Sequence, residues 1–339
     1  MFNKLYDNLK NFFLKNSRFF IFFIILAILF TIEFPYRVEI PGGYINVTER
    51  IEIDNSKSSK GSFNMAYVSE LSGTIPTLLI AFFNPNWDVS KNEDVLLENE
   101  TIEDLIFRNK LALKEANNNA TIVAYEKAGF DYEIKSKEFY IAYLDKNANT
   151  DLRIGDSIIE VDNIKIESKE QISKIIETKK IGDIINFKVL NDDKEYKRKA
   201  EVVNVDDTKI VGIAVYEMME LETDPKIEII NEESESGPSG GLMTALAIYD
   251  SLIEEDLTSG NTIIGTGTID ASGNVGSIGG VKYKLLGAVK NKAKIFIVPN
   301  GENYDEAMKL KNENNYDIEI IGVSTFEDTL ENIKEYNKK

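Results

Sequence analysis

The 339-residue chain is 43% hydrophobic and carries a net charge of −18, so it can build packed cores over two or three domains. An acidic chain without an offsetting basic stripe repels phosphate backbones, which excludes nucleic acid as an expected partner. The sequence contains no cysteine and no histidine. Disulfides, thiolate metal sites, Ser-His-Asp triads and HExxH zinc sites are therefore excluded before any motif is considered.

The first apolar segment predicts a membrane anchor. FFIFFIILAILFTI, residues 19–32, carries no charge, and Phe34 and Tyr36 extend its apolar surface to a length that crosses a bilayer. The alternative, a cleaved signal peptide, is disfavoured because no small-x-small cleavage site follows. The basic residues before it are Lys4, Lys10, Lys15 and Arg18. The positive-inside rule then predicts a cytoplasmic tail at 1–18, a transmembrane anchor at 19–36 and an extracytoplasmic body at the cell membrane.

Residues 37–124 predict a mixed extracytoplasmic region. RVEIPGGYINVTERIEI indicates strands around a Pro-Gly-Gly turn, and GSFNMAYVSEL indicates another strand. Residues 95–129 predict a helix, with acidic residues early and basic residues later.

Residues 125–205 predict a small α/β module. YIAYL, LRIGDSIIEVDN, INFKVL and KEYKRKAEVV indicate strands, and KEQISKIIETK an amphipathic helix with Ile172, Ile175 and Ile176 on one face. The segment LRIGDSIIEVDNIKI resembles a bacterial PDZ domain, and such domains bind extended peptides by adding a strand to a sheet edge beside a helix. The sequence has no clear Gly-Leu-Gly-Phe loop, so the resemblance does not extend to capture of C-terminal tails. A purely structural module is the alternative.

One loop in this module has the spacing of a calcium site. DKNANTD places oxygen-bearing side chains at alternate positions, namely Asp145, Asn147, Asn149 and Asp151. Thr150 stands where the EF-hand turn needs glycine, and Asp156 replaces the bidentate glutamate. Chance spacing is therefore favoured, and we expect no metal.

The segment GPSGG, residues 237–241, is a candidate nucleophile loop. It precedes a predicted helix, LMTALAIYDSLIEE, so Ser239 lies at a helix N-terminus. Unpaired amides between Gly237 and Gly240 would face a developing oxyanion there. The alternative is a serine that only caps the helix.

A serine in a chain without histidine needs another base. The G-x-S-x-G elbow of α/β-hydrolases requires a downstream histidine and is excluded. Lysine serves as a base when burial lowers its pKa. Lys282 and Lys284 both lie in the first turns of a helix predicted after Gly279-Gly280, and helical periodicity places Lys282 nearer the apolar face.

Four ordered motifs carry a resemblance. GPSGGLM, GTGTI, GSIGGVKYKLLGA and FIVP together resemble the proteolytic domain of Lon-type serine–lysine peptidases. With the anchor, FPYRVEIPGG, GSF and the PDZ-like segment, the layout resembles the membrane-anchored PDZ-containing Lon-like proteases of bacteria. The resemblance implies Ser239 as nucleophile, Lys284 as base and Thr266 as a hydroxyl close to both. Gly240 stands where the family usually has alanine.

We therefore expect an α+β multidomain protein with an N-terminal transmembrane helix, the PDZ-like domain and a Lon-type proteolytic α/β domain at 206–339. The resemblance implies a serine endopeptidase that cleaves polypeptides without a cofactor. No G-x-x-x-x-G-K-[ST] pattern occurs, which predicts ATP-independent cleavage of flexible or unfolded polypeptides. Lon-type domains often form rings, so a homo-oligomer is left open. The rival hypothesis is a catalytically inactive membrane-anchored PDZ scaffold that binds peptides; the retained Ser239 and Lys284 disfavour it.

Overall fold

The structure is a computed structural model that describes residues 2–54, 56–57, 59–98, 100–191, 193–205 and 207–338. The chain forms two compact units. The smaller unit comprises Met1–Pro41 and Val68–Val95, and the larger comprises Gly42–Tyr67 and Leu96–Lys339. The chain thus passes between the units three times, and strands β1 and β3 contribute to both.

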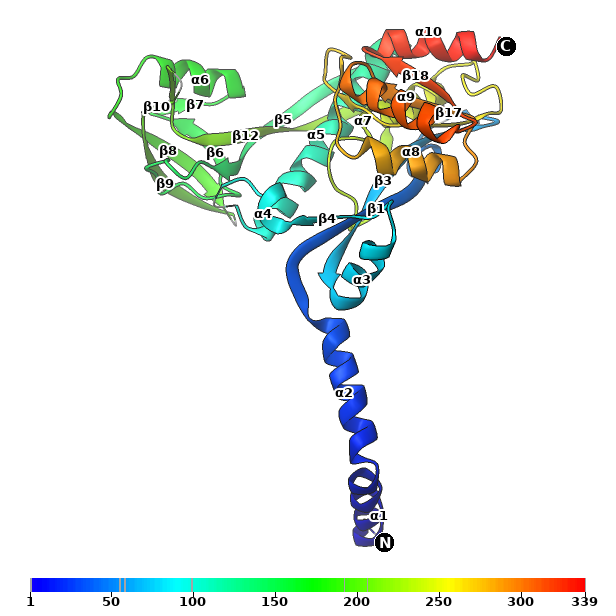
Figure 1. The fold of residues 1–339 in the computed structure, drawn as a ribbon. Helices are drawn as coiled ribbons and strands as arrows, with labels where there is room; N and C mark the ends of the chain where they lie inside the picture. Colours follow the sequence, from blue (N-terminus) through cyan, green and yellow to red (C-terminus); the bar gives the residue numbers. More distant parts are fainter. Residues whose placement is uncertain are drawn as a thin grey trace. The chain divides into compact units, whose positions relative to one another are not determined.

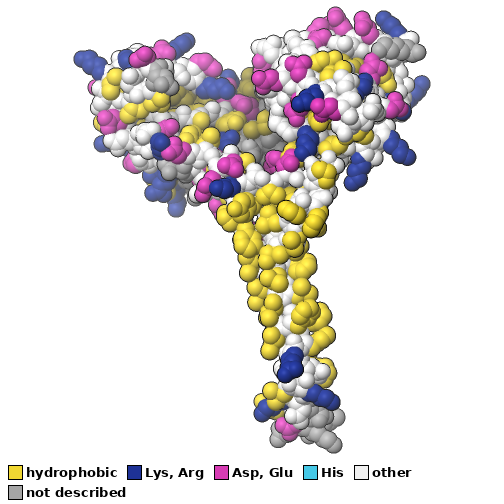
Figure 2. Space-filling view, viewed as in Figure 1, with side chains coloured by type: hydrophobic (Ala, Val, Ile, Leu, Met, Phe, Trp, Pro, Cys, Tyr) yellow, Lys and Arg dark blue, Asp and Glu magenta, His cyan; other side chains and the backbone are white. Residues whose placement is uncertain are grey.

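The smaller unit is built around two N-terminal helices and a short antiparallel pair. Its elements are α1 (Phe2–Lys15), α2 (Ser17–Thr31), the start of β1 (Glu33–Asn46), the end of β3 (Ser62–Thr74), α3 (Ile75–Phe83), β4 (Asp88–Lys91) and α4 (Asn92–Val95). Strand β1 pairs with β4 from Tyr36↔Lys91 to Glu39↔Asp88. Helix α2 has no buried residue, and exposed apolar side chains cover it (Figure 2).

The helix expected to continue to Tyr36 ends earlier. Helix α2 ends at Thr31, and Glu33 begins strand β1, so Phe34 and Tyr36 are extended rather than helical. The cause is the pairing of β1 with β4, which fixes the backbone of Tyr36 opposite Lys91. Within the described ranges, no helix is both long enough and apolar enough to cross a membrane.

Strand β1 also includes Pro41, Gly42 and Gly43, so the turn predicted at these residues is wrong. The glycines serve close packing instead. A Cβ at Gly42 would lie 2.4 Å from the carbonyl oxygen of Tyr67 on β3. A Cβ at Gly287 would lie 3.1 Å from the carbonyl oxygen of Gly42. The missing side chains let β3 and α8 approach the strand.

The larger unit contains a parallel sheet covered on both faces (Figure 1). Its strands lie in the order β18 (Glu319–Val323), β17 (Ile295–Pro299), β14 (Thr262–Gly265) and β3. The helices around it are α5 (Ile102–Ala128), α7 (Gly241–Leu252), α8 (Val281–Lys290), α9 (Glu302–Asn314) and α10 (Phe326–Tyr336). All five residues of β17 are buried, as expected of a parallel strand with helices on both sides.

Successive residues of these strands feed two separate cores. Ile263 and Ile297 pack in one core with α5, α7 and α10. Ile264 and Phe296 face the other core, which contains α8 and α9. The alternation follows from the two-residue period of a strand.

The region predicted at 37–124 is divided between the two units, and its residues 42–67 and 96–124 belong to this larger one. Val47, Ile51 and Phe63 lie in the core cluster of α7. Strand β2 (Ile51–Ile53) pairs with β13 (Ile227–Ile229), and η1 (Thr48–Arg50) precedes it. Two further short pairs are β10 (Val203–Val205) with β11 (Thr208–Ile210) and β15 (Thr268–Ile269) with β16 (Val275–Gly276).

A second, antiparallel sheet is inserted between α5 and β13. Its order is β12 (Ile213–Asp224), β5 (Asp131–Leu144), β6 (Ser157–Val161), β8 (Ile184–Asn191) and β9 (Lys194–Glu201), with β7 (Ile164–Lys165) beside β6. Helix α6 (Lys169–Glu177) buries Ile172, Ile175 and Ile176, as predicted. Strand β12 lies beyond residue 205, so the sheet of the PDZ-like segment includes residues assigned from sequence to the next domain.

Candidate active site

Ser239 lies in the loop that leads into α7. The helix begins at Gly241 with Gly240 as its N-cap, so Ser239 stands one residue before the cap and is not the cap itself. Gly237 adopts a φ of +86°, which favours glycine. The amide of Gly241 donates to the carbonyl of Pro238 at 3.1 Å and closes the turn around a partly exposed Ser239.

The backbone of Ser239 is held by the GTG segment after β14. Its carbonyl oxygen accepts from the amide of Gly267 at 2.8 Å and from Thr266 Oγ1 at 3.0 Å. The amide of Leu242 in turn donates to the carbonyl of Gly267 at 3.1 Å. Three hydrogen bonds therefore hold the serine loop against the GTG segment, and one of them joins Thr266 directly to the carbonyl of Ser239.

Lys284 is buried on α8, with 3% of its surface exposed. Burial disfavours the ammonium form and lowers the pKa of Lys284 from 10.5 to about 8. Its Nζ donates to Thr266 Oγ1 at 3.2 Å, and Thr266 is fully buried. The structure thus places Ser239, Thr266 and Lys284 in one hydrogen-bonded chain.

Helical periodicity placed Lys282 nearer the apolar face than Lys284, and this prediction is wrong, because Lys284 is the more buried of the two. Lys282 is partly exposed, and its Nζ lies 5.4 Å from the centre of the Tyr283 ring. Helix α8 packs against α9 and shares a core with β14 and β17, so it is buried on more than one side and a single apolar stripe does not describe it.

The hydrogen-bond directions give the lysine a defined geometry. Thr266 donates its only hydroxyl hydrogen to the carbonyl of Ser239, so its oxygen can only accept in the hydrogen bond with Lys284. A neutral amine has two hydrogens and one lone pair. Donating one hydrogen to Thr266 leaves the lone pair free to accept a proton from another group.

The backbone amides expected to donate to the oxyanion differ in whether another group already accepts their hydrogen. The amide of Gly237 donates to the carbonyl of Asn109 at 2.9 Å, so its proposed role as a donor is corrected to that of a loop anchor. Among the residues that the structure describes, the amides of Ser239 and Gly240 donate no hydrogen bond. These two amides precede the first turn of α7, where a negative charge is stabilised.

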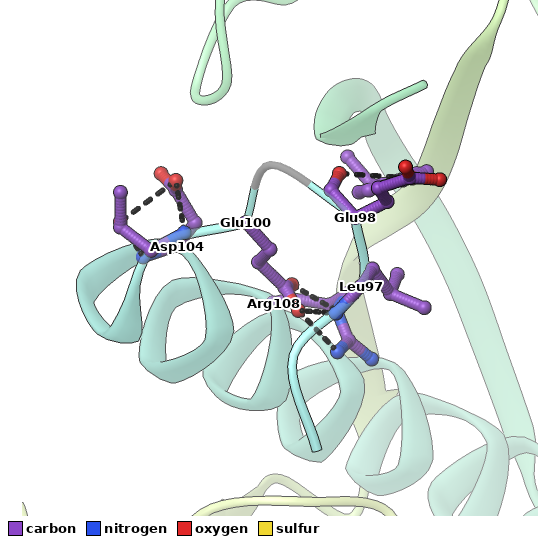
Figure 3. Close-up of polar contacts among 7 residues, drawn as sticks. Leu97, Glu98, Glu100, Asp104 and Arg108 are labelled. Carbon is purple, nitrogen blue, oxygen red and sulfur yellow. Dashed lines mark hydrogen bonds and ion pairs between the residues drawn. The ribbon is translucent and has the colours of Figure 1, made fainter. Parts of the chain in front are cut away.

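Asn109 lies on α5, whose start is fixed by a buried carboxylate (Figure 3). Glu100 accepts from Arg108 Nε at 2.7 Å, from Arg108 Nη2 at 3.0 Å and from the amide of Leu97 at 2.9 Å. Burial alone would raise the pKa of Glu100, but the hydrogen bonds from Arg108 and Leu97 outweigh it and lower the pKa. Because Asn109 follows Arg108 directly, this ion pair helps to place the carbonyl that holds Gly237.

Met65 and Asn109 touch the loop and were missed from sequence, since neither carries a motif. A Cβ at Gly240 would lie 2.5 Å from Met65 Sδ. The methionine sulfur thus occupies the space that the alanine usual in the family needs, which explains the glycine in this chain.

The loop with calcium-like spacing uses its oxygens internally. Asp145 Oδ1 accepts from the amide of Asn147 at 2.8 Å. Asp156 accepts from the amide of Arg153 at 2.8 Å and from Asn191 Nδ2 at 2.7 Å. Across the described part of the chain, no group of three or more acidic, histidine or cysteine side chains is arranged to hold a metal ion.

The edge strand of the inserted sheet on the β5 side is β12. Strand β12 runs antiparallel to β5 from Ile213↔Leu144 to Asp224↔Asp131, and it also contacts α6. A peptide cannot add to this edge of β5 while β12 occupies it.

A partly exposed serine in a glycine-rich loop and a buried lysine of lowered pKa, in a chain without histidine, are the groups that a serine–lysine hydrolase requires. Comparison with known proteins agrees at the level of family. The Lon protease (S16) C-terminal proteolytic domain matches residues 151–335, more than half of the chain, so the chain belongs to this family.

Two relatives illustrate the similarity. A Lon protease from Campylobacter jejuni is 28% identical over 221 residues, covering 61% of this chain and 25% of that protein. One from Mesomycoplasma hyopneumoniae is 35% identical over 91 residues, covering 27% of this chain and 10% of that protein. The chain thus spans about a quarter or less of the length of the curated relatives it matches.

Solved structures match a smaller part. The PDZ domain of an SdrC-like protein from Listeria monocytogenes is 21% identical, covers 24% of this chain and 92% of that chain, and gives a TM-score of 0.22. A solution structure from Geobacillus thermodenitrificans is 22% identical, covers 24% of this chain and 98% of that chain, and gives the same TM-score of 0.22. Scores at this level carry no weight for what the segment binds.

Proposed function

We propose that the protein is a membrane-tethered serine endopeptidase that cleaves flexible or unfolded polypeptides without ATP, outside the cytoplasmic membrane. The single observation that carries the proposal is the buried Lys284, whose pKa of about 8 makes it a base near neutral pH. A merely structural lysine has no need of burial beside a serine loop, because burying an ammonium costs free energy.

In this proposal the neutral Lys284 takes the hydroxyl proton of Ser239 as its Oγ attacks the peptide carbonyl. The amides of Ser239 and Gly240 donate to the oxyanion that forms. Lys284 then gives the proton to the leaving amine, and water hydrolyses the acyl-enzyme. Thr266 orients the amine through its hydroxyl and holds the Ser239 carbonyl, so it is a positioning residue.

Sequence features support the finer parts of the proposal. The apolar segment 19–32 behind a basic tail supports a tether with the body outside the cytoplasm. The absence of a P-loop pattern in the printed sequence supports cleavage without ATP, and hence a substrate that is already flexible. Since β12 covers the edge of β5, a substrate strand that adds to this side of the inserted sheet would pair with β12, the edge strand that contacts α6.

The test compares wild type with Ser239→Ala and Lys284→Ala in detergent micelles without ATP. Each is incubated with unstructured peptides and a loosely folded protein, and new termini are identified by mass spectrometry. We expect new termini with wild type alone. Equal cleavage by Ser239→Ala would remove the serine from the mechanism. Full activity in Lys284→Ala would reject the base.

A further inference from the structure

The smaller unit presents an apolar helix that nothing in the described part of that unit covers. Helix α3 (IPTLLIAFF) buries only Ala81. Phe82 is 81% exposed and Phe83 is 79% exposed, and Leu79 and Ile80 are exposed as well. Exposing large apolar side chains to water is costly, and adjacent ones mark an interaction surface. We call these four residues the α3 patch.

The surrounding sequence is unusual in its lack of charge. Residues 71–87 contain no acidic or basic side chain, although 28% of the whole chain is charged. The interval ends with Trp87, the only tryptophan, after the polar turn Asn84-Pro85-Asn86. A charge-free interval with an aromatic residue at its polar edge is typical of contact with the lipid interface.

The composition of the whole helix favours lipid over a protein groove. A groove receives one face of an amphipathic helix, whose other face is polar. Here the four patch residues share one broad face, and the rest of the helix carries a single polar residue, Thr77, so α3 has no polar face for water. A short helix that is apolar on several sides suits a surrounding of acyl chains.

The polar groups at the start of α3 are satisfied within the helix. Thr74 and Thr77 form a capping box, in which each side chain accepts from the backbone amide of the other residue. Pro76 removes another donor from the first turn. Backbone groups need such internal partners where water is excluded.

Contacts within the same unit place α3 beside the segment proposed as the tether. Helix α3 contacts α2 (Figure 1). A Cβ at Gly73 would lie 2.5 Å from the carbonyl oxygen of Tyr36, so the strand that enters α3 packs against residues that follow α2. The α3 patch is therefore continuous with the exposed apolar surface of α2.

We infer that α3 is a second membrane contact, a monotopic helix that inserts the α3 patch among the acyl chains of the leaflet next to the enzyme body. The inference rests on the proposed tethering for its position. Nine residues of helix extend about 14 Å, which is too short to span a bilayer but long enough to lie in one leaflet. Two attachments would hold the smaller unit more firmly at the membrane than α2 alone.

The absence of cysteine allows a direct test, because a single introduced cysteine is the only labelling site. Phe82→Cys, Ile25→Cys on α2 and Glu302→Cys on α9 are made in the full chain, labelled with a nitroxide and reconstituted into vesicles of phosphatidylcholine and phosphatidylglycerol. The accessibility of each label to oxygen, which enters lipid, is compared with its accessibility to a water-soluble nickel chelate. We expect the oxygen-to-nickel ratio at Phe82→Cys and Ile25→Cys to exceed that at Glu302→Cys several-fold.

The three sites separate the inference from the tether. A high ratio at Ile25→Cys with a ratio at Phe82→Cys equal to that of Glu302→Cys overturns the α3 contact and keeps the tether. A high ratio at Phe82→Cys alone supports α3 and rejects the α2 tether. Low ratios at both reject both. Low accessibility to both reagents at Phe82→Cys, with spin–spin broadening that grows with the protein-to-lipid ratio, identifies a second copy as the occupant and overturns the lipid assignment.

Discussion

Replacing Lys284 with methionine should stabilise the protein while it abolishes proteolysis. In the folded protein the pKa of Lys284 is about 8, against 10.5 for an ordinary lysine. Each pKa unit corresponds to about 1.4 kcal/mol, so the buried ammonium costs about 3 kcal/mol of folding free energy at pH values below 8. Methionine keeps a similar shape without the charge, but it loses the hydrogen bond to Thr266, worth about 1 kcal/mol.

The sign of the pH dependence follows from the lowered pKa. Between pH 8 and 10.5 the unfolded chain binds more protons at this lysine than the folded protein does, so wild-type stability rises with pH across that window. The Lys284→Met variant should therefore be more stable than wild type by about 2 kcal/mol at pH 6.5. This advantage should vanish by about pH 10.5, where the folded protein holds the neutral amine and the unfolded chain is already half deprotonated.

The assay is guanidinium unfolding of the full chain in detergent micelles, followed by far-ultraviolet circular dichroism at pH 6.5, 8.5 and 10.5. Lys282→Met is the matched control, because it removes the same charge from a partly exposed position of α8. The control should retain turnover and change the unfolding free energy by less than about 1 kcal/mol. A Lys284→Met variant that is less stable than wild type at pH 6.5, or whose advantage does not change with pH, would refute the buried-base reasoning.

Three further perturbations test the parts around the lysine. Thr266→Val removes the shared hydroxyl, so the turnover number should fall about 10- to 100-fold with little change in KM, and a shifted pH–rate profile would separate positioning from misfolding. Gly240→Ala should cost less than about 1.5 kcal/mol in thermal unfolding and retain activity, because the flexible end of Met65 can move; complete loss of activity would show that the glycine itself is required. Arg108→Ala leaves the carboxylate of Glu100 unpaired and should cost about 3 kcal/mol in urea unfolding at pH 7, less near pH 4 as Glu100 becomes protonated; an equal loss at both pH values would contradict this account.

Local features of the sequence predicted the elements that carry the candidate site. Strong periodicity and glycine punctuation predicted α7 after GPSGG, α8 after Gly279-Gly280 and α6 with its isoleucine face. These predictions succeed because the buried and exposed faces of a helix follow from the residues three and four positions apart in its own sequence.

Features that depend on distant partners were not predictable in this way. Lys284 is buried where α8 meets Thr266, a residue that follows β14, and no pattern inside α8 predicts this contact. Gly42 serves close packing against β3, and a turn and a close approach demand the same residue type. Strand β12 joins the sheet of β5, although the sequence assigned it to the same domain as the serine loop.

The parallel pairing of Ser62 with Thr262 has a consequence for the order of folding. Two hundred residues separate these partners, so the central sheet is a contact of very high sequence separation, and closing it is slow. The inserted sheet closes within one continuous stretch and can fold while the rest of the chain is still being made. The GTG segment and α8 follow Thr262, so Ser239, Thr266 and Lys284 meet only after α8 has been synthesised. Synthesis itself therefore delays the assembly of this site until long after the inserted sheet has emerged.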